Sequence, residues 1–299
     1  MTMKPMSLWS EGDWVFAIAL VLLAAFLAAG LMIATRKSEE YAGHPRGLFV
    51  LFFAEMWERF SYYGMRAILV FYLVDHWDFT ESTGQGILGA YASLVYITPV
   101  LGGWLADRYL GQRKAVLFGG VLLAIGHGLM AVEGKGGQDD PVMAVLWAAL
   151  AFIVVGSGFL KANISVIVGQ LYPMSDARRD SAYTIFYMGI NAGAAIGTIL
   201  VGYLGETVGW SYGFGLAGIG MVLGLLVFMA YKPLLLGKGE APDPQKLASP
   251  VMGIRLEPLL YGIGVASVAI VWGLLQYRDV IQTILLVSGF ALLGYVLYE

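Results

Sequence analysis

Predominantly apolar runs of about 20 residues recur along this chain, with short polar segments between them. A helix of that length crosses the roughly 30 Å hydrocarbon core of a bilayer, whereas each strand of a membrane barrel needs only about 10 residues of alternating polarity. Hydrophobic residues make up 59% of the 299 residues and charged residues 13%, whereas soluble domains are about 45–50% apolar. The sequence therefore predicts an all-α integral membrane protein.

Nine runs are long enough to be membrane helices. They cover Trp14–Ala34, Gly47–Asp75, Gly84–Ala106, Ala115–Val132, Val142–Gln170, Ser181–Gly205, Tyr212–Tyr231, Glu257–Gln276 and Val280–Tyr298. The first run is longer than the apolar core of a signal peptide, and basic residues follow it rather than precede it. We therefore expect it to be a retained helix.

Composition divides the chain into four parts. Residues 232–256 include the stretch KPLLLGKGEAPDPQKLASP, whose Pro, Gly and charged residues are typical of a linker. Residues 1–40 contain the first helix and its loop, residues 41–231 contain six helices, and residues 257–299 contain two more. We expect a six-helix bundle with one extra span before it and two further helices after the linker.

Basic residues are distributed unevenly between the two sides of the predicted membrane helices. Twelve of the eighteen Lys and Arg residues fall in loops on one side, three fall on the other, and three lie within spans. Cytoplasmic loops carry an excess of Lys and Arg. The sequence therefore predicts an external N-terminus and a cytoplasmic segment 232–256.

The second predicted span carries charge. At 3.6 residues per turn, Glu55, Glu58, Arg59 and Arg66 fall on one face of the helix, which also includes Tyr62 and Tyr63. A charge at membrane depth costs on the order of 2.5–3.5 kcal/mol, and it is tolerated where it has partners or faces a water-filled cavity. This stripe predicts an ion or substrate pathway, with a structural salt-bridge network as the alternative.

Lys161 is the one charged residue in the span Val142–Gln170, and it lies near the middle of that span. An unpaired lysine at that depth either loses its proton or finds a carboxylate. Glu55 and Glu58 are the carboxylates inside the predicted spans other than the span-end residues Asp75 and Glu257. We therefore expect an ion pair between Lys161 and one of these two glutamates.

Two further segments carry polar residues among glycines. Residues 102–114 (GGWLADRYLGQRK) close one span and open the next, so Asp107 and Arg108 belong either to a tight basic turn or to a latch that opens when the protein rearranges. The second segment spaces three glycines four residues apart, at positions 189, 193 and 197, as in a close helix-packing face. Asn191 lies on another side of that helix, where its amide either forms a hydrogen bond to a neighbouring helix or contacts a ligand.

The sequence lacks the signatures of several other classes of protein. It has no cysteine, so thiolate metal sites, disulfides and cysteine nucleophiles are excluded. Metal-ligand spacings, the G-x-S-x-G nucleophile elbow and the nucleotide-binding P-loop are missing, which argues against an enzyme or an ATP-driven pump. No basic patch suggests nucleic acid, and we expect neither a metal nor a cofactor.

Four stretches together carry a resemblance to one family. Residues 55–64 (EMWERFSYYG), 158–163 (GFLKAN) and 186–194 (FYMGINAGA) resemble signatures of the proton-dependent oligopeptide transporters, the POT or PTR family. Residues 103–114 resemble the cytoplasmic loop motif of the wider major facilitator superfamily. The resemblance covers about residues 43–299.

The resemblance implies the major facilitator fold and proton-coupled import of di- and tripeptides across the bacterial inner membrane, with protons as the coupling ion. It implies that proton coupling involves Glu55, Glu58, Arg59 and Lys161. It implies a peptide pocket formed by Arg59, Tyr62, Tyr63, Tyr91, Lys161 and Asn191. It implies gating by Arg66, Asp107 and Arg108.

This chain departs from the family pattern in two respects. The family has a second six-helix bundle, which would supply a carboxylate for Arg66 and for the peptide amino terminus, and we expect that bundle to lie outside this chain. The first span, Trp14–Ala34, is extra, and packing at the edge of the bundle is the simple expectation. Alternative functions are a symporter of another anionic solute, such as nitrate, or a membrane receptor or scaffold that transports nothing.

Overall fold

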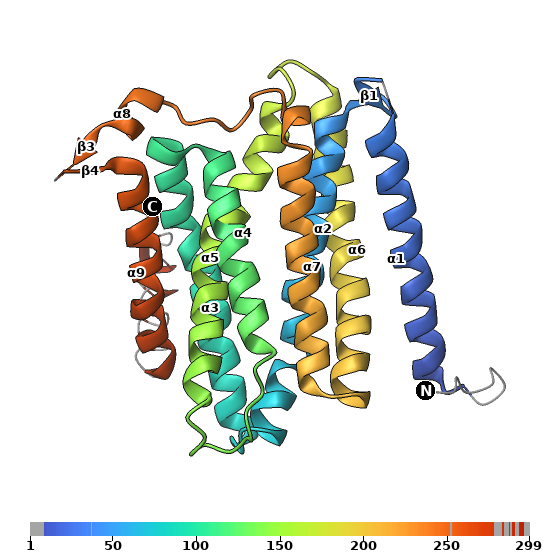
Figure 1. The fold of residues 1–299 in the computed structure, drawn as a ribbon, viewed down its shortest axis with the longest axis vertical. Coiled ribbons are helices and arrows are strands. Elements are labelled where there is room, and N and C mark those ends of the chain that lie inside the picture. Colours follow the sequence, from blue (N-terminus) through green and yellow to red (C-terminus); the bar gives the residue numbers. More distant parts are fainter. Residues whose placement is uncertain are drawn as a thin grey trace.

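The computed structural model describes residues 9–36, 38–251 and 253–277, together with 283, 287, 289–290 and 293–295. It confirms an all-α membrane protein: the described residues form eight long helices that run roughly parallel to one another (Figure 1). They are α1 (Glu11–Thr35), α2 (Arg46–Asp75), α3 (Glu81–Leu105), α4 (Gln112–Met130), α5 (Met143–Gln170), α6 (Arg178–Thr207), α7 (Trp210–Ala230) and α9 (Leu256–Gln276). The expected ninth span, Val280–Tyr298, lies largely outside the described residues.

Helices α2 to α7 form the expected bundle of six, and α1 and α9 flank it on opposite sides (Figure 1). Seven of the described helices are long and apolar enough to cross a membrane. The eighth, α2, is 30 residues long and carries the charged stripe, yet 21 of its residues are buried among the other helices. The long helix with the most charged residues in the described structure is therefore also a central one.

Glycines set the closest helix contacts. A Cβ atom built on Gly193 would lie 2.1 Å from the carbonyl oxygen of Met56, and one on Gly197 would lie 2.3 Å from that of Phe60. Gly189 faces Phe52 in the same way. The glycine row on α6 thus packs on residues of α2 that are also four apart, which confirms the predicted packing face.

The flanking helices are fastened by polar and aromatic contacts. Near the start of α1, the hydroxyl of Tyr203 donates a hydrogen bond to Asp13, and the ring of Tyr203 stacks on Phe16 at 4.3 Å. On the other side, Lys114 of α4 forms an ion pair of 2.7 Å with Glu257 of α9. The extra first helix therefore packs at the edge of the bundle, as expected.

Residues 232–256 are more ordered than a linker composition suggests. They form a 3₁₀ turn (Lys232–Leu235), the short helix α8 (Pro244–Ala248) and a hairpin of β3 (Pro250–Val251) with β4 (Ile254–Arg255). The start of α4 holds this segment, because Arg113 pairs with Glu240 at 2.5 Å and its backbone N–H donates to the carbonyl of Gly239. We call this end of the bundle, which also bears Arg36, Arg46 and Arg178, the basic end.

Candidate functional site

The charged stripe of α2 forms a buried cluster around one arginine. The Nε atom of Arg59 lies 2.6 Å from Oε1 of Glu55 and 2.9 Å from Oε2 of Glu58. All three side chains are at least nine-tenths buried. The first pair has the i, i+4 spacing that brings side chains together on one helix face, with the glutamate on the N-terminal side. The helix therefore supplies its own counter-ion to both carboxylates.

The cluster has spare hydrogen-bonding capacity. Oε2 of Glu55 and Oε1 of Glu58 are buried and have no hydrogen-bond partner among the described residues. Two carboxylates share one guanidinium, so the three side chains together carry a net negative charge when both acids are ionised. Buried polar atoms are nearly always satisfied, and exceptions concentrate at functional sites. The arrangement is suited to gaining a proton or a polar ligand.

The expected ion pair between Lys161 and a glutamate is not formed, and that prediction was wrong. The ammonium of Lys161 instead lies 4.7 Å from the ring centre of Tyr62 and 4.7 Å from that of Tyr96. Both glutamates are bound to Arg59, which reaches them from their own helix. Aromatic faces attract a cation without neutralising its charge, so Lys161 remains available to an anion.

Close contact between α3 and α5 brings Lys161 to this place. A Cβ atom on Gly102 would lie 2.1 Å from the carbonyl oxygen of Gly158, so only glycine allows the two backbones to meet there. Asn163, which is buried, donates hydrogen bonds to carbonyls of both helices, at 2.7 Å to Phe159 and 3.4 Å to Gly102. Lys161 follows Gly158 by one helix turn and therefore faces the tyrosines of α2 and α3.

Three of the predicted tyrosines gather beside the cluster. Tyr62 stacks on Tyr91 with ring centres 6.3 Å apart, and Tyr63 packs edge-on against Tyr62 at 5.2 Å. The hydroxyls of Tyr62 and Tyr91 are buried and without a hydrogen-bond partner among the described residues. The sequence analysis did not single out Tyr96. The signal that could have identified it is its position as an aromatic residue on α3, the helix that carries Tyr91.

The remaining predicted site residues lie farther out. Arg66 is half-buried and takes part in none of the ion pairs found among the described residues. Asn191 is exposed, and its amide donates to the Tyr187 carbonyl of its own helix. Asp107 and Arg108 are exposed in a π-helical turn (Ala106–Leu110) at the basic end, where Asp107 accepts a 2.7 Å hydrogen bond from Gln112. No hydrogen bond or ion pair among the described residues joins these four residues to the cluster.

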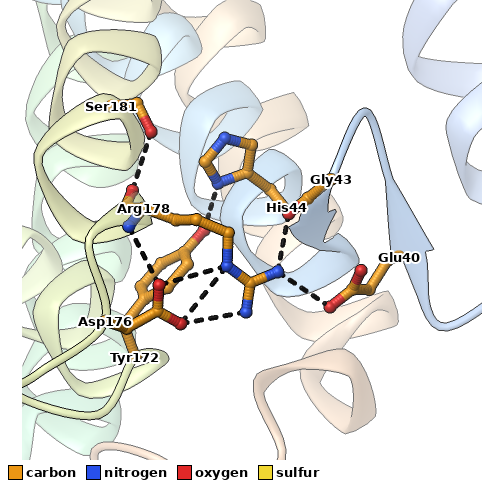
Figure 2. A network of polar contacts seen from close by, with 7 residues as sticks. All are labelled: Glu40, Gly43, His44, Tyr172, Asp176, Arg178 and Ser181. Atoms are coloured by element: carbon orange, nitrogen blue, oxygen red, sulfur yellow. Dashed lines mark hydrogen bonds and ion pairs between the residues drawn. The ribbon is translucent and has the colours of Figure 1, made fainter.

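A second polar network fastens the start of α2 at the basic end (Figure 2), and the sequence analysis did not predict it. The guanidinium of Arg178 bonds Asp176, at 2.9 Å, and Glu40, at 3.1 Å. Beside it, the buried ring of His44 lies 2.8 Å from the hydroxyl of Tyr172. The hairpin of β1 (Glu40–Tyr41) with β2 (His44–Pro45) is thus tied to the loop between α5 and α6.

Asp176 and Tyr172 of this network have shifted pKa values. Hydrogen bonds from the Arg178 side chain lower the pKa of Asp176 below its ordinary value of 3.8. Burial raises the pKa of Tyr172 to about 12, an effect that the positive charge of Arg178 partly offsets. The network is therefore at full strength around neutral pH, where Asp176 is ionised and Tyr172 is not.

Comparison with known proteins confirms the resemblance. Residues 113–246 match the model of the POT family. The chain is 43% identical over 235 residues to an uncharacterized transporter of Bacillus subtilis, covering 77% of this chain and 45% of that protein. It is 42% identical over 202 residues to a peptide transporter of Yersinia enterocolitica, covering 66% of this chain and 39% of the relative.

Solved structures agree with the sequence matches. A crystal structure of a POT peptide transporter in complex with sulfate superposes with a TM-score of 0.69 at 39% identity, covering 89% of this chain and 54% of the other. The chain thus spans about half the length of the relatives that it matches.

Proposed function

The chain belongs to the POT family, and on that premise we propose that it takes part in the proton-coupled import of di- and tripeptides by alternating access. The observation that carries the proposal is the buried cluster of Glu55, Glu58 and Arg59, with Lys161 held nearby by tyrosine rings. Charged groups at membrane depth mark ion and substrate pathways. The Yersinia relative and the solved POT structure are both described as peptide transporters.

In the proposed mechanism the proton acts on the carboxylates that share Arg59. With both glutamates ionised, one guanidinium is divided between two negative charges. A proton on either glutamate leaves Arg59 with one ionic partner and frees part of the guanidinium for the carboxylate terminus of a peptide. Because both events use Arg59, proton binding and peptide binding are linked.

Lys161 would bind the same peptide carboxylate. Its charge is stabilised by two aromatic faces but is not neutralised, so no ion pair has to break before a peptide arrives. The rest of the peptide site would be lined by Tyr62, Tyr63, Tyr91 and Asn191. Recognition aimed at the peptide termini would tolerate many side chains.

The proposal extends to gating and to the setting of the protein. Arg66 would pair with a carboxylate of a C-terminal six-helix bundle of the same protein, and Asp107 and Arg108 would gate the basic end. The protein would lie in the bacterial inner membrane with residues 1–10 outside and the basic end in the cytoplasm. The excess of Lys and Arg in the loops of that end supports this orientation.

The test is uptake of dialanine into proteoliposomes by the protein expressed from its complete reading frame. Uptake is expected to require an inward proton gradient and to be abolished by Glu58→Gln and by Lys161→Ala, with the exposed Lys238→Ala as the matched control. Uptake that persists unchanged in the two site variants would refute the assignment of the cluster. Nitrate uptake without dialanine uptake would favour an anion symporter, and no uptake of either would favour a receptor or scaffold.

A further inference from the structure

An apolar cavity lies inside the membrane region between the extra helix α1 and the bundle helices α2 and α7. Its volume is about 200 Å³. It is lined by Leu27, Gly30, Ala34, Phe53, Trp57 and Val227, among others. Apolar cavities of about 150 Å³ stay dry and take up apolar molecules. Leu27 and Leu31, which line one side, are 47% and 66% exposed, so this side of the cavity is open to the surroundings of the bundle.

One end of the cavity carries a positive charge. Arg46, at the start of α2, lines it, and its Nη2 and Nη1 atoms donate to the carbonyls of Ala34 and Ser38. Its Nε atom is buried and has no hydrogen-bond partner in the described part of the chain. The ion pairs found between described residues do not include Arg46. This guanidinium therefore keeps a free donor and an uncompensated charge.

The length of the cavity fits one leaflet of a bilayer. From Arg46 to Trp57 the cavity follows eleven residues of α2, which is about 16 Å at 1.5 Å per residue. The hydrocarbon core of one leaflet is about 15 Å thick, half of roughly 30 Å. An acyl chain that enters beside Arg46 would reach the midplane near Trp57.

We propose that this cavity binds one phospholipid from the leaflet at the basic end, with one acyl chain between α1 and α2 and the phosphate on the guanidinium of Arg46. A phosphate is the partner that matches an unpaired guanidinium donor at the membrane surface. Basic sites between helices on the positively charged side of membrane proteins bind anionic head groups. The extra helix α1 thereby gains a role, since it forms one wall of the site.

The test measures the first lipid bound to the purified chain by native mass spectrometry, with dioleoyl phosphatidylglycerol and the uncharged dioleoylglycerol as probes. The wild-type chain is expected to hold one phosphatidylglycerol at least about tenfold more tightly than the diacylglycerol, the factor that corresponds to a difference of 1.4 kcal/mol. Arg46→Gln should remove this preference and leave diacylglycerol binding unchanged, and Arg46→Lys should restore part of it. Arg36→Gln, at the same end but outside the cavity, is the matched control.

A second variant tests the apolar part. Ala34→Trp fills the cavity and should weaken binding of the first lipid about tenfold, whereas Leu22→Trp adds the same side chain to an exposed position of α1 outside the cavity and should leave binding unchanged. If Ala34→Trp does not fold, brominated acyl chains should quench the fluorescence of Trp57, measured as the difference between wild type and Trp57→Phe. Equal binding of both lipids by the wild type, or no quenching of Trp57, overturns the proposal.

Discussion

Replacing Gly193 by alanine tests the packing that holds the charged helix in place. The added Cβ atom would lie 2.1 Å from the carbonyl oxygen of Met56, whereas ordinary contacts begin near 3.4 Å. Neither helix backbone can yield locally, so α2 and α6 must move apart by about 1 Å. The same Cβ atom would lie 3.1 Å from Cβ of Arg59, which places the strain directly beside the charged cluster.

The expected cost follows from two opposing effects. Overpacking a close contact costs about 1–3 kcal/mol, and alanine regains up to about 1 kcal/mol over glycine in a helix. The net effect of Gly193→Ala is therefore a loss of about 1–2 kcal/mol. At Gly202, on the same helix, an added Cβ atom meets nothing within 4 Å, so Gly202→Ala keeps only the helix-propensity gain.

Thermal unfolding of the purified chain in one detergent separates these cases. The melting temperature of Gly193→Ala should lie below that of the wild type, and that of Gly202→Ala should lie at or above it. Gly197→Ala should resemble Gly193→Ala, because its Cβ atom would lie 2.3 Å from a carbonyl oxygen. A melting temperature of Gly193→Ala equal to or above that of Gly202→Ala would refute this expectation, because the close backbone contact would then have no effect on stability.

Three further predictions concern charged and polar contacts. Arg59→Met leaves two buried carboxylates without their counter-ion and should lower the free energy of unfolding by about 3–5 kcal/mol. Replacing both glutamates by glutamine in the same variant should restore most of this loss. Tyr172→Phe removes the hydrogen-bond partner of His44 and should lower the free energy of unfolding by about 1 kcal/mol. The pKa of Tyr172 is raised on folding, so its contribution to stability falls as the pH rises from 10 to 12. Tyr172→Phe should therefore lose less stability than the wild type over this pH range. The pKa of Asp176 is lowered on folding, so stability should fall as the pH drops below about 4, and Asp176→Asn should weaken this acid dependence relative to wild type.

The helices and one of their closest contacts could be predicted because both depend on periodic sequence features. Apolar runs of about 20 residues fix where helices must lie in a membrane, since an unpaired backbone is not tolerated there. Three glycines at four-residue spacing define one face of α6, and that face meets α2 in the structure. The polar network around His44 escaped prediction because its members come from a hairpin, a loop and the start of α6 and show no common period.

The partner of Lys161 was mispredicted because the sequence reveals which charges exist but not which of them meet. Arg59 and Glu55 are one turn apart on the same helix, so their ion pair needs no tertiary fit. Lys161 belongs to α5 and reaches the same region only through the close approach of α3 and α5 at Gly102 and Gly158. A contact within one helix takes precedence when two cations compete for the same carboxylates.

That outcome changes what proton coupling would require of each cation. If Lys161 were paired with a glutamate, peptide binding and proton binding would both have to break that pair, and the loss of Lys161 would alter both. Among the described residues, Arg59 is the cation that forms ion pairs with the two carboxylates, and Lys161 is held by Tyr62 and Tyr96. Under the proposed function, Lys161→Ala should therefore weaken peptide binding by a similar factor at every pH. Substitutions of Arg59 should weaken peptide binding and also reduce the dependence of this binding on pH. If the Lys161 and Arg59 variants both lose the pH dependence of peptide binding, Lys161 also takes part in proton coupling.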